Sequence, residues 1–180
     1  MLDRRDVVKR LVADRGDLLV VPGLGAPTYD VAAAGDHPLN FYLWGAMGGA
    51  AMIGLGLALA RPDRRVAVIT GDGEMLMGLG SLATIGVKQP SNLAIVVLDN
   101  LRYGETGMQA SHTAAGIDLI GIAKSCRFTE ARAADNCESR AWPGLFLLGM
   151  PCARNLNSAF LRGIAADARA VANRIANGHA

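Results

Sequence analysis

The sequence has little net charge and few cysteine or aromatic residues. Its 18 Lys and Arg residues nearly balance its 16 Asp and Glu residues, so charge gives no reason to expect a nucleic-acid partner. The three cysteines form no Cys-x-x-Cys pair, which indicates neither a disulfide framework nor a structural zinc site. We therefore expect a cytoplasmic protein that does not bind nucleic acid.

Charge is missing altogether from residues 38–60, a run long enough to cross a bilayer on paper. Five of these 23 residues are glycines, and an aromatic cluster lies near one end. We expect a short strand, a glycine turn and a tightly packed helix, and no membrane partner. A membrane span is the alternative, because Gly-x-x-x-Gly spacing also marks transmembrane packing. The first residues lack the apolar core of a signal peptide.

The length of 180 residues and a hydrophobic content of 51% predict one compact domain over residues 1–180. Apolar runs predict strands at residues 17–21, 39–42, 66–70, 93–98 and 145–148. Helices are predicted at residues 2–14, 47–60, 74–88 and 118–126 and in the final 30 residues, with a loop at 22–27. Strands without polar alternation, separated by helices, predict a three-layer α/β/α fold with a mainly parallel central sheet.

Polar residues follow the predicted strands where ligands bind in such a sheet, at its carboxyl ends. The loops 22–28, 71–74 and 99–113 are expected to line one crevice there. Asp72 and Asn100 end neighbouring strands, and their side-chain oxygens suit Mg²⁺. A helix opening after Asp72 suits phosphate. A metal-bridged diphosphate is the simplest occupant.

Each motif taken alone also has a purely structural interpretation. Gly-Asp-Gly after a strand is most often a turn, and so is Asn at a strand end. Gly23-Leu24-Gly25 invites a dinucleotide fold, but Thr28 stands where the third glycine is required. No acidic residue ends the following strand at the ribose position either, since Asp36 precedes it.

Together, the motifs resemble a known family. Gly71-Asp72-Gly73, followed by Asp99-Asn100, is similar to the Gly-Asp-Gly to Asn-Asn signature of thiamine diphosphate enzymes, with Asp in place of the first Asn. The resemblance implies that Asp72, Asn100 and the main-chain carbonyl of Arg102 hold Mg²⁺. It also implies that loss of the first Asn matters little, because the second is the ligand.

Upstream, Trp44-Gly45-Ala46-Met47-Gly48 looks like the Trp-Gly-Ser-(Ile/Met)-Gly segment of the decarboxylase branch. The resemblance implies that Met47 wedges under the cofactor and holds its aminopyrimidine near the thiazolium, while the Gly45 carbonyl accepts a hydrogen bond from the amino group. Taken alone, Met47 reads as a flexible core filler.

Residues 70–84 and 98–113 resemble the sulfopyruvate and phosphonopyruvate decarboxylases more closely still, whereas residues 127–180 are atypical. The loop that ends at Thr113 is expected to close over the cofactor, with His112 as a catalytic candidate against an anionic substrate. The alternative is a solvent-exposed loop histidine. The cofactor-binding residues that the resemblance implies are Gly45, Met47, Gly71, Asp72, Gly73, Glu74, Asn100, Arg102 and Tyr103.

The sequence lacks any match to the pyrimidine-binding domain, which supplies the activating glutamate in this family. Glu74 belongs to the diphosphate loop and Glu105 to the closing loop, while Glu130 and Glu138 lie in the atypical part. The resemblance therefore implies a hetero-oligomer with a pyrimidine-binding subunit that acts on a small 2-oxo acid. Three functions stay open: a decarboxylase subunit, a catalytically silent cofactor-binding or scaffold subunit, and an acetolactate synthase-like carboligase subunit.

Overall fold

The chain folds around a five-stranded sheet. The computed structural model describes residues 4–133 and 144–148. The strands, in the order in which they lie in the sheet, are β1 (Leu19–Pro22), β2 (Val66–Gly71), β3 (Leu93–Leu98), β7 (Gly144–Leu148) and β6 (Ala131–Ala133). All four strand pairings are parallel, so the carboxyl ends of all five strands lie at one edge. The predicted parallel sheet is confirmed.

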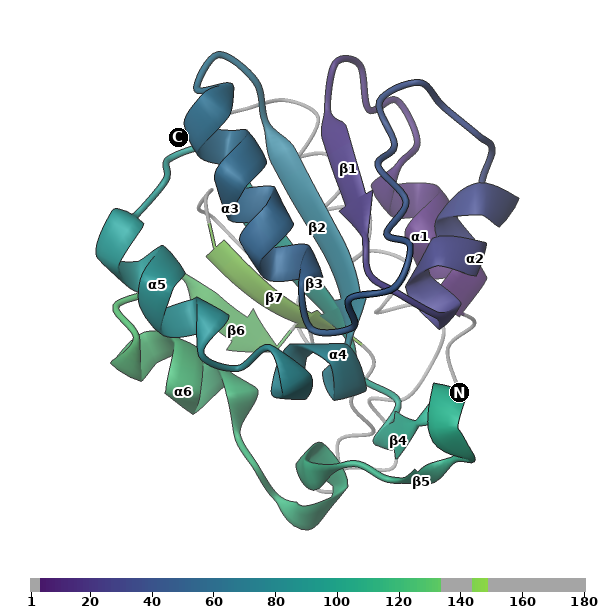
Figure 1. Ribbon diagram of the computed structural model, residues 1–180, viewed down its shortest axis with the longest axis vertical. Coiled ribbons are helices and arrows are strands. Elements are labelled where there is room, and N and C mark those ends of the chain that lie inside the picture. Colours follow the sequence, from purple (N-terminus) through teal and green to yellow (C-terminus); the bar gives the residue numbers. More distant parts are fainter. Residues whose placement is uncertain (1–3, 134–143, 149–180) are drawn as a thin grey trace.

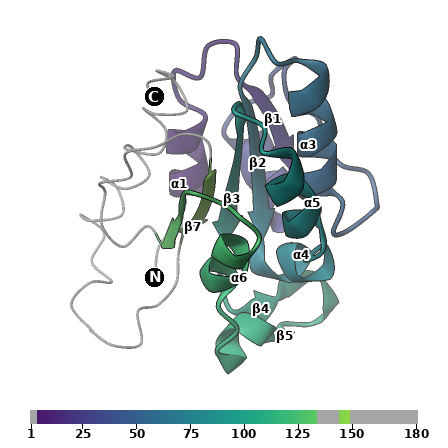
Figure 2. The same cartoon turned by 90° about the vertical axis from the view of Figure 1, so that its left-hand side faces the viewer.

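Helices cover both faces of this sheet, as the two views in Figures 1 and 2 show. One face carries α1 (Arg4–Leu11) and α2 (Ala26–Ala33), and the other carries α3 (Ala50–Ala60), α4 (Asp72–Met77), α5 (Ser81–Lys88) and α6 (Leu119–Ser125). Along β2, Val66 and Val68 pack toward α3, while Ala67 and Ile69 pack toward α1 and α2. Both faces of the strand are buried, which explains its unbroken apolar sequence.

Three predicted elements differ from the structure. Part of the loop predicted at 22–27 belongs to α2, which has a proline in its first turn, where the missing N–H costs nothing. Residues 39–42 form no strand, because Asn40 makes only an isolated bridge to Val20. The helix predicted at 74–88 is two helices, α4 and α5, with Gly78 capping the first.

The loop that follows β3 contains structure of its own. A two-stranded antiparallel hairpin pairs β4 (Arg102–Tyr103) with β5 (Gln109–Ala110), and short 3₁₀ turns span Gly104–Thr106 and His112–Ala115. Figure 1 shows this hairpin beside α4, beyond the carboxyl ends of the strands. The closing loop is thus a folded flap over that edge.

The uncharged run of residues 38–60 contains α3, which is 11 residues long. Within the part of the chain that the structure describes, no helix is both long enough and apolar enough to span a membrane. The helix predicted in the final 30 residues lies outside the described residues. In the atypical part, the structure adds β6, which the sequence did not predict.

Candidate functional site

The three loops expected to share a crevice do meet at the carboxyl edge. The backbone of Gly23, after β1, lies against the carboxylate of Glu74 in α4. A Cβ added to Gly25 would lie 2.6 Å from Oε1 of Glu105 in the flap. The main-chain N–H of Asn100, after β3, lies 3.4 Å from Oδ1 of Asp72. Contacts between side chains of one loop and the backbone of another therefore join the ends of β1, β2 and β3.

Asp72 is the buried centre of this edge. Its side chain follows β2 directly, and the residue is only 2% exposed. Its Oδ2 lies 3.3 Å from the hydroxyl of Thr113. The same hydroxyl lies 3.0 Å from Oδ1 of Asp99, which is 3% exposed. One threonine hydroxyl thus stands between two buried carboxylates, and it has a single proton to donate.

Asp99 is short of favourable partners. Its Oδ1 also accepts a hydrogen bond from the main-chain N–H of Leu101, at 2.9 Å, but its buried Oδ2 has none among the described residues. Burial, and to a smaller extent the charge of Asp72, raise the pKa of Asp99 to about 6. Asp99, which replaces the family's first Asn, therefore places a second carboxylate beside Asp72.

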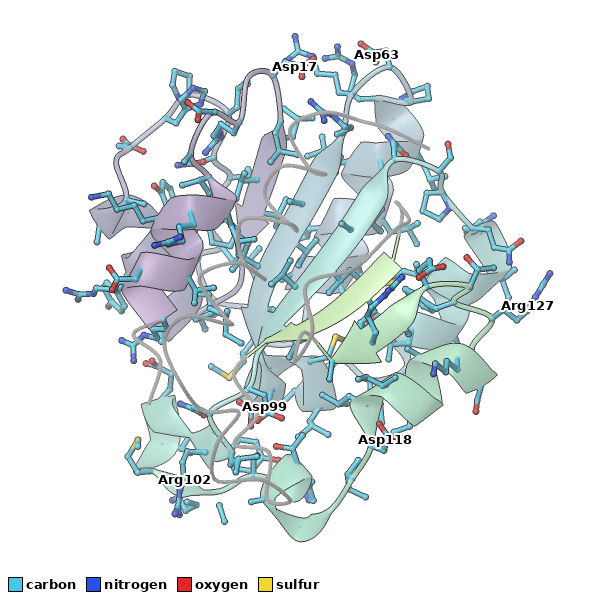
Figure 3. The ribbon with its side chains drawn as sticks, turned by 180° about the vertical axis from the view of Figure 1, so that it is seen from behind. Asp17, Asp63, Asp99, Arg102, Asp118 and Arg127 are labelled. Atoms are coloured by element: carbon cyan, nitrogen blue, oxygen red, sulfur yellow. The ribbon has the colours of Figure 1, made fainter. Side chains whose placement is uncertain are left out.

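Asn100 and Arg102 lie next to this pair. The carboxamide Oδ1 of Asn100 accepts a hydrogen bond from the main-chain N–H of Arg102, at 2.9 Å, and it keeps a second lone pair for another partner. Figure 3 shows Asp99 and Arg102 at the same end of the molecule, opposite Asp17 and Asp63. The side-chain atoms beside Asp72 that could bind a metal ion are oxygens.

That oxygen set fits Mg²⁺. Two buried carboxylates with too few hydrogen-bond donors are stabilised by a divalent cation, and hard oxygen ligands suit magnesium. Among the described residues, no group of three or more His, Cys, Asp or Glu side chains is arranged to hold a metal by itself. Magnesium fits such a site because it takes one or two carboxylates and completes its shell with water and phosphate oxygens.

A glycine loop before α3 carries the expected cofactor wedge. Gly45, Ala46 and Gly48 have positive φ angles of 76°, 54° and 93°, and half-buried Met47 lies among them. Oε1 of Glu74 accepts a hydrogen bond from the Gly48 N–H, at 3.3 Å. The loop that presents Met47 is therefore tied to α4.

The side chain of Glu74 links α4 to β2 and to the glycine loop. Its Oε2 accepts a hydrogen bond from the hydroxyl of Thr70, at 2.7 Å, and the residue is 5% exposed. Since both carboxylate oxygens are used within the protein, Glu74 can meet a diphosphate only through its main-chain N–H. Gly71 ends β2 and Gly73 lies in the first turn of α4.

The flap brings Tyr103 and His112 together. The hydroxyl of Tyr103 is hydrogen-bonded to Nδ1 of His112, and the two rings meet edge to face with centroids 5.8 Å apart. His112 itself is exposed. The predicted site residues therefore lie in three groups: around Asp72, in the glycine loop tied to α4, and in the flap.

Sequence reasoning missed three contributors to this site. Thr113, Asp99 as a second carboxylate, and Glu74 as a tie all depend on contacts between distant segments. One signal was available for Thr113, since a short polar residue in the flap sequence follows directly after the histidine. No local sequence pattern predicts the contacts of Asp99 and Glu74.

Comparison with known proteins agrees with this geometry. A family model described as "Thiamine pyrophosphate enzyme, C-terminal TPP binding domain" matches residues 24–140. Sulfopyruvate decarboxylase subunit beta of Methanocaldococcus jannaschii is 45% identical over 124 residues, which cover 68% of this chain and 65% of that protein. The subunit of the same name from Methanothermobacter thermautotrophicus is 44% identical over 136 residues, covering 76% and 72%. The match thus spans about two thirds of these relatives.

A longer relative and a solved structure extend the comparison. Phosphonopyruvate decarboxylase of Streptomyces viridochromogenes is 42% identical over 133 residues, 73% of this chain and 32% of that protein. The structure of 2-oxoglutarate:ferredoxin oxidoreductase from Magnetococcus marinus shares the fold, with a TM-score of 0.50 and 24% identity over 59% of this chain and 38% of that one. The chain therefore belongs to the thiamine pyrophosphate enzymes, and residues 24–140 match their C-terminal TPP binding domain.

Proposed function

We propose that this chain is the thiamine diphosphate- and Mg²⁺-binding subunit of a two-subunit decarboxylase that acts on a small 2-oxo acid. The observation that carries the proposal is the pair of buried carboxylates, Asp72 and Asp99, bridged by one threonine hydroxyl at the carboxyl edge. Relatives named sulfopyruvate and phosphonopyruvate decarboxylase support the reaction type. Their named substrates are 2-oxo acids with a second anionic group.

In this proposal the carboxyl edge binds the diphosphate end of the cofactor. The Asp72 carboxylate, the Asn100 carboxamide oxygen and the Arg102 carbonyl would hold Mg²⁺, which would supply positive charge to offset the buried carboxylates and the diphosphate. The main-chain N–H groups of Gly73 and Glu74, at the start of α4, donate to the same oxygens.

The other end of the cofactor lies toward the glycine loop. Met47 would support it, and the Gly45 carbonyl would accept a hydrogen bond from its amino group. Thiamine diphosphate, when bound, supplies the electron sink that decarboxylation requires. His112 donates a hydrogen bond to the anionic substrate. The flap that carries His112 keeps water away from the reacting atoms.

A second chain supplies the activating glutamate in this proposal. The relatives' name "subunit beta" supports a partner subunit. Of the described glutamates near the site, Glu74 is engaged with Thr70 and Gly48, and Glu105 is an exposed residue of the flap beside Gly25. A pyrimidine-binding subunit therefore completes the site, and the assembly is a hetero-oligomer.

Asp72→Ala tests the metal assignment. Magnesium-dependent binding of thiamine diphosphate, measured by titration calorimetry on the complex with the pyrimidine-binding subunit, should weaken by at least about 100-fold, because a ligand and its charge are lost. Asp63→Asn removes the same charge at the far end of the molecule and should leave the affinity unchanged. Full affinity in the Asp72→Ala complex would refute the assignment.

Product analysis separates the alternatives. The chain is combined with a candidate pyrimidine-binding subunit, and CO₂ and organic products are measured with sulfopyruvate, phosphonopyruvate and pyruvate. A decarboxylase releases CO₂ and a free aldehyde. A carboligase joins two keto acids, and a scaffold subunit gives no turnover above background with any of them.

A further inference from the structure

The ring of Tyr103 is held rigidly at the base of the flap. A Cβ added to Gly73 would lie 2.8 Å from Cδ1 of Tyr103, so the ring packs directly on the first turn of α4. The Tyr103 carbonyl also accepts a hydrogen bond from the Met108 N–H, at 3.0 Å. The hydroxyl is therefore presented from a fixed position.

His112 is fixed from the other side by its neighbours in sequence. Ser111 and Thr113 are 2% and 8% exposed, and their hydroxyls are hydrogen-bonded to each other at 2.8 Å. Thr113 in turn contacts Asp72. Because both flanking side chains point into the protein, the imidazole of His112 projects outward beside the carboxyl edge.

The direction of the bond between the two rings decides which imidazole nitrogen carries the proton. A phenol O–H is a stronger acid than a neutral imidazole N–H, and an imidazole nitrogen is a stronger base than a phenol oxygen, so the tyrosine is the better donor. Donation to Nδ1 leaves the proton on Nε2. The ring has no second hydrogen-bond partner among residues 4–133 and 144–148.

We propose that Tyr103 is a positioning residue whose hydroxyl donates a hydrogen bond to Nδ1 of His112 and so holds the neutral imidazole as the Nε2–H tautomer, a donor to an oxyanion of the substrate. This inference rests on the proposed function for the identity of the substrate, but the tautomer is a property of the chain itself. A neutral donor binds a carboxylate, sulfonate or phosphonate oxygen without first taking up a proton.

The tautomer is measured by long-range ¹H–¹⁵N NMR of the histidine rings in the full chain, with magnesium and thiamine diphosphate absent. His112→Gln identifies the His112 signals. In the parent chain at alkaline pH, His112 should show the Nε2–H pattern, and Tyr103→Phe should shift it toward a mixture. Tyr29→Phe, which changes an exposed tyrosine of α2, is the matched control and should have no effect. An Nδ1–H pattern, or an unchanged pattern in Tyr103→Phe, overturns the inference.

Kinetics of the complex with its pyrimidine-binding subunit give the second readout. Tyr103→Phe should lower kcat/KM for the anionic 2-oxo acid by about 3- to 10-fold, and it should have no further effect in a His112→Gln background, because both changes act through one donor. Additive losses contradict a positioning role. If the complex has no activity while the Nε2–H tautomer is present and depends on Tyr103, the proposed function fails and this inference stands.

Discussion

At the scale of single residues, Asp99 is the position where this chain differs from the signature it resembles. The family's Asn would be neutral there, whereas Asp99 is a buried acid beside Asp72, and its Oδ2 has no hydrogen-bond partner among the residues that the structure describes. The sequence led us to expect that this difference matters little. The structure shows a second buried carboxylate at the centre of the site, where burial and the charge of Asp72 disfavour the ionised form of Asp99 and raise its pKa.

Asp99→Asn should therefore stabilise the metal-free chain. Because the folded protein raises the pKa of Asp99 to about 6, the penalty is fully present above pH 6 and disappears as the pH falls toward the ordinary Asp value of about 4. In EDTA at pH 7.5 we expect a rise in Tm of roughly 2–6 °C. The gain should shrink steadily between pH 6 and pH 4.

Asp118→Asn is the matched control for that experiment. Asp118 caps α6 by accepting a hydrogen bond from the Ile120 N–H, at 2.9 Å, and Asn caps helices about as well. Its Tm should stay close to that of the parent at every pH. A gain in Asp99→Asn that is absent or independent of pH would contradict the explanation from buried charge.

At the scale of elements, the break between α4 and α5 shows what local sequence could and could not predict. Apolar residues at helical spacing predicted one helix at 74–88. The structure packs the backbone of Gly78 against the carbonyl of Gly48, and this contact fixes the glycine loop that carries Met47. The helix ends where a backbone from another segment comes close, and no pattern within residues 74–88 contains that information.

Gly78→Ala should weaken both the fold and the cofactor site. Its φ of −97° suits any residue, so the effect comes only from the collision of the new methyl group with Gly48. We expect a loss of about 1–3 kcal/mol in the free energy of unfolding, measured by urea denaturation, and weaker thiamine diphosphate binding in the complex. Gly80→Ala, with nothing within 4 Å of the added Cβ, should leave both nearly unchanged. Equal effects from the two variants would contradict this account.

The strands β1, β2, β3 and β7 were predictable from sequence because each is an unbroken apolar run between turn signals. The sheet neighbours β2 and β3 and the polar residues at their ends followed from that pattern and from the parallel topology it requires. The hairpin of the flap and β6 were not predictable, because each is only two or three residues long. Such short strands form when the rest of the fold places their partners alongside.

At the scale of the whole molecule, one surface is notable for exposed apolar side chains. Trp44 is 99% exposed and Phe41 is 55% exposed, and both lie in the loop that precedes α3. A tryptophan surrounded by water is costly in an isolated subunit, and buried tryptophan is a frequent hot spot in interfaces. This surface is where we expect the pyrimidine-binding subunit to dock.

Trp44→Ala should weaken subunit association by about 10- to 100-fold, measured by calorimetry with the pyrimidine-binding subunit. Val87→Ala removes another exposed apolar side chain, from α5, and is the control, with no change expected. In a Trp142→Phe background, the emission of Trp44 should shift to shorter wavelength on association. An unshifted spectrum in a complex that forms would place the interface elsewhere.

Trp44 and Met47 are three residues apart on the same loop, and Glu74 and Gly78 hold that loop to α4. If the partner docks at Trp44 and Met47 supports the cofactor, the two binding events act on the same loop and are coupled. By thermodynamic reciprocity, whatever factor the partner adds to cofactor affinity, the cofactor adds to partner affinity. The affinity between the two subunits would then depend on the concentration of thiamine diphosphate. The subunits would associate more weakly when the cofactor is scarce and more tightly when it is plentiful.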